Sequence, residues 1–238
     1  MALVQYLSLR LVEDPHSTNR SAWRLAKPIK TVRLRPAAEL GSIKTVILTA
    51  GVSSATNDTQ LIYATNLTGI ALVLDIFLPL VPPGSSLIII ASVAGHLLPR
   101  NPDLETHMAT APTASLLMHH ELERDTDPSH AYGVSRLGCI VRAQYSAARW
   151  VRKGVRINTV SPGAIETPML GQVLRSEQGP FAQSMIDNTT LGRTGTPDEI
   201  AGIVEFLAGP NAGLMAGSDL IVDGSVLSMQ RWPGGIAE

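Results

Sequence analysis

Cysteine, aromatic and charged side chains are all scarce in this chain of 238 residues. Its single cysteine, Cys139, excludes an internal disulfide framework and any four-thiolate zinc or iron–sulfur site. Charged residues make up 16% and the formal net charge is −1, which argues against a disordered chain and a general nucleic-acid binder. Aromatic residues, at 4%, are too few for a base-stacking surface. We expect a folded protein in a reducing, cytoplasmic compartment.

Uninterrupted hydrophobic runs are also missing. Residues 67–98 are apolar on average, but Asp75 and the turn Pro82-Pro83-Gly84 divide them. Neither half reaches the roughly 20 apolar residues that span a bilayer. Residues 1–12 have no basic residue ahead of their apolar run and make a poor signal peptide. The sequence therefore predicts no membrane span.

Four short runs have the composition of buried strands. They are rich in β-branched residues, lack a clean alternation of polar and apolar positions, and cover residues 45–49, 86–91, 155–160 and 220–222. Such runs are typical of strands buried on both faces of a parallel sheet.

Helical patterns lie between these runs. We predict helices over residues 57–80 and 131–152, and a third helix that begins at Thr196-Pro197-Asp198-Glu199. Thr as N-cap, Pro at the first helical position and Glu three residues after the cap are strong helix-start signals. Alternating strands and helices indicate an α/β fold with a doubly wound parallel sheet (Rossmann-like), formed by a single domain over residues 1–238.

Two regions fit this pattern less well. Residues 97–130 are polar, and we predict a partly helical surface insertion there. Its adjacent His119 and His120 would diverge on a helix, so we expect solvated surface histidines and no metal site. Residues 1–40 are basic and atypical, although Leu7, Leu9 and Leu11 alternate as in a strand.

A few polar residues stand where chemistry is plausible. Tyr132 and Arg136 are four residues apart and would share a helix face, where a guanidinium favours the phenolate form of tyrosine. Ser92 follows the second strand, and ligands of open α/β sheets bind at the carboxyl ends of strands. Asn66 is an amide in an apolar helix and requires a hydrogen-bond partner. A surface Tyr–Arg pair and a turn-capping serine are the alternative interpretations.

Together these elements resemble the short-chain dehydrogenase/reductases, over roughly residues 43–228. The resemblance rests on Ser92, Tyr132-x-x-x-Arg136, Asn158 to Gly163, Glu166-Thr167-Pro168, Thr49-Ala50-Gly51 and Val222-Asp223-Gly224. Ser92 and Tyr132 are 40 positions apart, a wider gap than most members have. This insertion is similar to that of the bacterial 3α-hydroxysteroid dehydrogenase/carbonyl reductase branch.

The resemblance implies an oxidoreductase that uses NAD or NADP to interconvert a secondary alcohol and a ketone, on a hydrophobic ring substrate such as a steroid or terpenoid. It implies a homodimer or homotetramer. The implied catalytic residues are Tyr132 as acid/base, Ser92 as holder of the substrate oxygen, Asn66 as anchor of a relay water, and Arg136 in place of the family's lysine. The implied cofactor-binding residues are Thr49, Ala50, Gly51, Pro162, Gly163 and Thr167.

Three departures accompany this resemblance. Arg136 replaces the lysine, and Thr49 replaces the asparagine that precedes Ala-Gly. No G-x-G occurs in the chain, and only 48 residues precede Thr49, roughly one β–α unit fewer than in the family. Two alternatives therefore stay open: a nucleotide-binding-deficient member that acts as a binding or subunit protein, and a cofactor-free isomerase or dehydratase.

Overall fold

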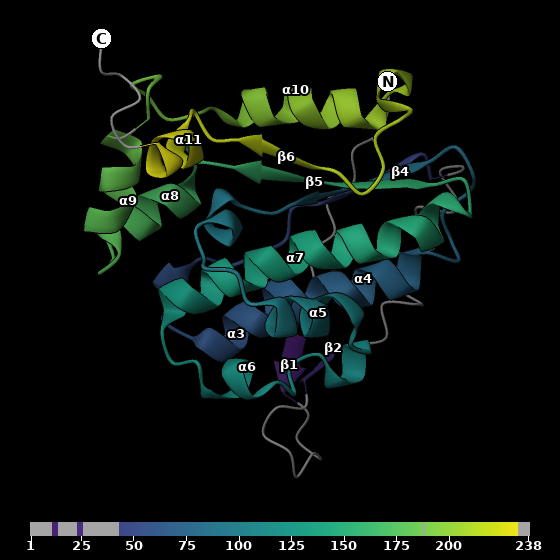
Figure 1. The fold of residues 1–238 in the computed structure, drawn as a ribbon, viewed down its shortest axis with the longest axis horizontal. Helices are drawn as coiled ribbons and strands as arrows, with labels where there is room; N and C mark the ends of the chain where they lie inside the picture. Colours follow the sequence, from purple (N-terminus) through teal and green to yellow (C-terminus); the bar gives the residue numbers. More distant parts are fainter. Residues whose placement is uncertain (1–10, 14–22, 26–42, 188, 233–238) are drawn as a thin grey trace.

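The computed structural model describes residues 11–13, 23–25, 43–187 and 189–232. At its centre lies a four-stranded parallel sheet in the order β3-β4-β5-β6 (Figure 1). The strands are β3 (Thr45–Leu48), β4 (Ser86–Ile90), β5 (Arg156–Pro162) and β6 (Asp219–Val222). All four predicted strands are confirmed, with bounds that differ by one or two residues. Two short strands, β1 (Leu11–Glu13) and β2 (Trp23–Leu25), form a separate antiparallel pair. The rest of the atypical segment 1–40, with Leu7 and Leu9, lies outside the described residues.

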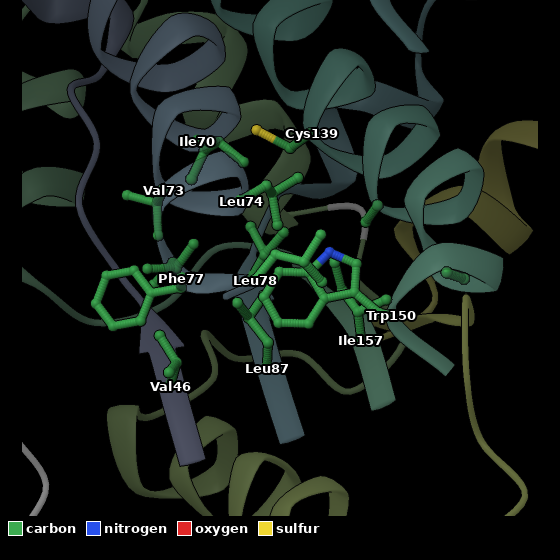
Figure 2. Close-up of a cluster of buried hydrophobic side chains, with 14 of the residues drawn as sticks. Val46, Ile70, Val73, Leu74, Phe77, Leu78, Leu87, Cys139, Trp150 and Ile157 are labelled. Atoms are coloured by element: carbon green, nitrogen blue, oxygen red, sulfur yellow. The ribbon is translucent and has the colours of Figure 1, made fainter. Parts of the chain in front are cut away.

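Helices cover both faces of the parallel sheet, as an α/β fold requires. α10 (Pro197–Ala208) lies on one face, and α4 (Gly69–Phe77) and α7 (Pro128–Val151) lie on the other (Figure 1). The predicted start of α10 is confirmed, since Thr196 and Glu199 form a reciprocal capping box. On the α7 side, Trp150 lies beside Leu87 and Ile157 in a hydrophobic cluster that also contains Phe77 (Figure 2).

The helix predicted over residues 57–80 consists of three parts: α3 (Thr59–Ile62), a π-helical segment η2 (Tyr63–Thr68), and α4. By length and composition alone, the stretch from Thr59 to Phe77 could cross a membrane. However, 61% of an 18-residue window within this stretch is buried inside the fold. The buried side chains pack on the sheet and on α7. A helix in the core of an α/β domain passes the same test of length and composition.

The insertion (residues 97–130) is part of the core and not only a surface feature. It contains α5 (Pro102–Thr110), a 3-10 turn η4 (Thr113–Ser115) and α6 (His120–Arg124). Leu104, Met108, Leu116 and Leu122 are buried against residues of η2 and α7.

The prediction of solvated histidines at 119 and 120 is wrong for His119, which is only 8% exposed. His119 precedes α6 as its N-cap, where its ring accepts a hydrogen bond from the Glu121 backbone nitrogen. The two rings therefore stack, with centroids 4.6 Å apart, instead of diverging as on a helix. Among the described residues, no cluster of histidine, cysteine and acidic side chains could hold a metal ion.

The remaining elements are short. They are η1 (Ser54–Thr56), η3 (Val93–His96), α8 (Pro168–Leu174), α9 (Gly179–Asp187), η5 (Pro210–Ala212) and α11 (Val226–Arg231). α8, α9 and α11 gather at the end of the sheet toward which the strand arrows point (Figure 1).

Candidate active site

The parallel register brings the ends of all four strands to one edge of the sheet. Gly51 follows β3, Ser92 follows β4, Gly163 follows β5 and Asp223 follows β6. Ligands of open α/β sheets bind outside these carboxyl ends. Most of the polar residues singled out in the sequence therefore border one edge.

Ser92 directly precedes η3, the segment that packs on α7 near Gly133 and Leu137. It is the N-cap of η3, and its hydroxyl oxygen accepts a hydrogen bond from the Ala94 backbone nitrogen at 3.2 Å. In the described part of the chain, its hydroxyl proton has no acceptor. η3 packs closely on α7: a Cβ added at Gly95 would lie 2.7 Å from the Leu137 backbone nitrogen. Ser92 thus combines a capping role with a free hydroxyl donor.

Tyr132 and Arg136 share one face of α7, as their spacing predicted. The guanidinium carbon of Arg136 lies 5.0 Å from the centre of the half-buried Tyr132 ring. Arg136 is buried, and its Nη1 donates to the Ile90 carbonyl at 3.3 Å, at the end of β4. Although burial opposes the charge, the neighbouring Tyr132 and Cys139 favour it, and the net effect raises the pKa of Arg136. A permanent positive charge therefore stands beside the tyrosine.

Gly51 lies between Arg136 and Asn66. A Cβ added at Gly51 would lie 2.3 Å from Arg136 Nη2 and 3.1 Å from Asn66 Oδ1. This close approach joins the end of β3 to η2 and α7, so that three of the predicted site residues meet.

The Asn66 side chain is fully engaged with protein groups. Its Oδ1 accepts from the Val52 backbone nitrogen at 2.9 Å, and its Nδ2 donates to the Val52 carbonyl at 2.9 Å and to Ser135 Oγ at 3.2 Å. The amide therefore has the partners that its burial requires. The Asn66 main-chain carbonyl also has a partner, since it accepts a contact from Cys139 Sγ at 3.1 Å.

Pro162, Gly163 and Thr167 border the same edge on the β5 side. The Gly163 nitrogen donates to the Val222 carbonyl at 2.9 Å, and a Cβ added at Gly163 would lie 2.8 Å from Asp223 Cα. Thr167 caps α8, accepting from the Leu170 nitrogen and donating to the Ile165 carbonyl, both at 3.2 Å. Within the described residues, no hydrogen bond joins Thr167 to Ser92 or Tyr132. Thr49 is exposed and Ala50 half-buried after β3.

One polar network, between η3, β5 and the amino end of β6, was missed by sequence reasoning. The Asp219 carboxylate pairs with His96 Nε2 at 2.7 Å and accepts from Ser161 Oγ at 3.0 Å and from the Thr159 hydroxyl. It ties β6 and β5 to η3, just after Ser92. The network depends on the pairing of Thr159 with Asp219 across two strands. The only available signal in the sequence was a histidine four residues after Ser92.

The nicotinamide end of an NAD(P) cofactor fits the residues at this edge. Arg136 Nε is buried and has no hydrogen-bond partner among the described residues, so it is a donor that a ribose hydroxyl oxygen would satisfy. Gly51, Pro162, Gly163 and Thr167 are the residues that would line this end. The pyrophosphate end is different, since the sequence contains no glycine-rich turn to receive it.

Comparison with known proteins agrees with this architecture. The family profile described as enoyl-(acyl carrier protein) reductase matches residues 105–226. The short-chain dehydrogenase/reductase bsc3 of Alternaria brassicicola is 29% identical over 231 residues, which cover 95% of this chain and 84% of the relative. The 3-alpha-hydroxysteroid dehydrogenase/carbonyl reductase of Comamonas testosteroni is 30% identical over 192 residues, 78% of this chain and 73% of the relative.

A solved structure is similar throughout the fold. The 3-alpha-hydroxysteroid dehydrogenase of Pseudomonas sp. B-0831, crystallised with NADH, superimposes with a TM-score of 0.71 and 26% identity. The match covers 83% of this chain and 78% of that protein. Sequence and structure therefore place this chain in the short-chain dehydrogenase/reductase family of oxidoreductases.

Proposed function

We propose that the chain interconverts a secondary alcohol and a ketone with NAD or NADP, on a hydrophobic ring substrate such as a steroid or terpenoid. The proposal rests on one observation: the Ser92 segment packs on the turn of α7 that carries Tyr132, beside the buried charge of Arg136. The relatives named for hydroxysteroid dehydrogenase activity support the substrate class.

The chemistry follows from the groups at the strand ends. In the direction of oxidation, the Tyr132 phenolate removes the proton of the substrate hydroxyl; in reduction, the phenol returns it. The Ser92 hydroxyl donates a hydrogen bond to the substrate oxygen and holds it next to Tyr132. The Arg136 guanidinium places a positive charge beside the Tyr132 ring. The cofactor, when bound, accepts or supplies the hydride.

The segment over the strand ends suits an apolar substrate. α8 and α9 cover this end of the sheet, and Phe181 on α9 is 62% exposed. An aromatic ring exposed on α9 offers apolar contact to a ligand bound at this end of the sheet.

The first experiment is calorimetric titration of the full chain with NAD(H) and NADP(H). Micromolar binding is the expected result, and a screen of ring ketones and ring alcohols for turnover would follow. Tyr132→Phe is the matched variant: it should bind the cofactor like the wild type and lose about 10²- to 10⁴-fold in kcat. No binding up to millimolar cofactor would rule out hydride transfer by this chain.

The missing glycine-rich turn favours a second candidate, a cofactor-free isomerase or dehydratase that uses the same tyrosine. Conversion of a ring ketone without added nicotinamide, lost in Tyr132→Phe, would identify it. If neither reaction occurs, the chain acts as a binding or subunit protein. The cytoplasmic location and the homodimeric or homotetrameric state stay predictions, and sedimentation of the purified chain tests the latter.

A further inference from the structure

A cavity of about 490 Å³ lies along the C-terminal half of α7, between α7, the end of α4 and the segment that follows α5. Its lining includes Arg142 and Arg149 of α7, the C-cap residue Arg152 and Asp75 of α4, and we refer to it as the arginine groove. Tyr132 and Arg142 are ten residues apart on α7, which corresponds to about 15 Å along a helix. The groove is therefore separate from the candidate active site.

The groove carries an excess of positive charge. It has three guanidinium groups and one carboxylate, and the Asp75 carboxylate already accepts a hydrogen bond from Thr113 Oγ1 at 2.7 Å. Arg149 and Arg152 are exposed, and within the described part of the chain neither forms an ion pair. Among the described residues, no ion pair therefore compensates these two positive charges at the C-terminal end of α7.

Arg142 makes one wall of this groove rigid. It is only 8% exposed, and its Nη1 and Nη2 donate to the carbonyls of Met108 and Ala111 at 2.8 and 2.9 Å. Burial lowers its pKa, and the nearby Asp75 acts in the opposite direction. These contacts use two of the five N–H donors of a guanidinium, which holds the group in place and leaves donors for a further acceptor.

The groove also offers apolar surface to the body of a ligand. Tyr145 is 62% exposed, and Leu74 and Ala109 belong to the lining. The volume falls within the range of about 300–1,000 Å³ that is typical of small-molecule sites.

We propose that the arginine groove binds a small molecule that carries a phosphate or carboxylate group on a planar or apolar body. Guanidinium groups recognise both anions through paired N–H donors. Arg149 and Arg152 would contact the anion, and Tyr145 would pack on the body. This site adds a ligand to the protein that the proposed oxidoreductase reaction does not require.

The test is calorimetric titration of the full chain with phenyl phosphate, with benzoate as the carboxylate probe and phenol as the uncharged control. We expect saturable binding of phenyl phosphate or benzoate, weakened by added salt, and none of phenol. Arg149→Gln/Arg152→Gln should weaken this binding at least about tenfold. The matched variant Arg124→Gln/Arg231→Gln removes the same charge from exposed positions outside the groove and should bind like the wild type.

Several results would overturn the proposal. They are the absence of saturable binding by either anionic probe, or binding that is equal in the groove variant and the matched variant. If Arg149→Gln/Arg152→Gln lowers the melting temperature and leaves probe binding unchanged, these arginines stabilise the C-terminal end of α7, where the helix dipole is negative. A groove variant that changes the oligomeric state and binds no probe would show that the groove is an interface between subunits.

Discussion

The guanidinium carbon of Arg136 stands 5.0 Å from the centre of the Tyr132 ring, while its Nη1 reaches the Ile90 carbonyl at the end of β4. One side chain thus places a positive charge beside the proposed acid/base and ties α7 to the sheet. Its Nε is left buried without a partner among the described residues. A lysine would carry the same charge without this orphaned donor.

Arg136→Lys is expected to raise kcat/KM for alcohol oxidation about tenfold, which corresponds to ~1.4 kcal/mol of transition-state stabilisation. The reason is that the compact ammonium keeps the charge near Tyr132 and has rotatable N–H donors that can follow a ribose hydroxyl oxygen, whereas the planar guanidinium is held by the Ile90 carbonyl. The measurement is steady-state turnover of a ring alcohol. Arg156→Lys is the control, since Arg156 donates to main-chain carbonyls at the opposite end of the sheet. A fall in rate for Arg136→Lys would mean that the guanidinium itself is required.

Gly95→Ala tests the contact between the Ser92 segment and α7. The added Cβ would meet the Leu137 backbone nitrogen at 2.7 Å, so η3 must move away from α7. We expect the free energy of unfolding to fall by about 1–3 kcal/mol and kcat to decrease. Gly202→Ala is the matched variant, because a Cβ there meets nothing within 4 Å on α10 and should stabilise the helix by about 0.5–1 kcal/mol. The free energy of unfolding of both variants is measured by urea denaturation. Equal values for Gly95→Ala and Gly202→Ala would contradict the close packing of η3 on α7.

Asn66→Ala tests whether the amide holds the loop after β3. Its loss leaves the N–H and C=O of the half-buried Val52 without their side-chain partner, and unpaired groups cost about 1–3 kcal/mol each when buried. We expect a destabilisation of about 2–4 kcal/mol in urea denaturation. Asn211→Ala, at an exposed position, should stay within about 0.5 kcal/mol of the wild type. If both variants unfold at the same urea concentration, the hydrogen bonds of Asn66 contribute nothing to stability.

The capping box of α10 should make stability depend on pH in the acidic range. Hydrogen bonds from Arg193, followed by that of the Thr196 backbone, lower the pKa of Glu199 from 4.5 to about 2. A carboxylate whose pKa is depressed in the folded state stabilises it above the unfolded pKa. This contribution is therefore complete above pH 4.5 and disappears as the pH falls toward 2.

Glu199→Gln should accordingly flatten the decrease in unfolding free energy over this range, measured by urea denaturation at several pH values. Glu205→Gln is the control on the same helix, because Glu205 is exposed and makes none of these contacts. A pH dependence that is the same in Glu199→Gln and in the wild type would show that another carboxylate is responsible.

The sequence by itself determined the elements and the order of the site residues. Runs such as residues 86–91 are apolar at every position after Ser86 and end at polar or turn residues, so they can only be stable between two layers. The start of α10 could be predicted because Thr196 and Glu199 cap the helix through contacts between residues only three positions apart. The Tyr132–Arg136 pair could also be predicted from local spacing, since residues four positions apart lie about one helical turn from each other.

Only the tertiary structure decided what depends on residues far apart in the chain. The burial of His119, the partners of Asn66, the joining of His96 to Asp219 and the packing of the insertion on α7 are contacts of this kind. The periodicity of the sequence does not predict these contacts, because they depend on strand register and on how the helices pack on the sheet. The arginine groove also depends on such contacts. Arg142, Arg149 and Arg152 line one cavity only because α4 and the segment after α5 pack beside α7.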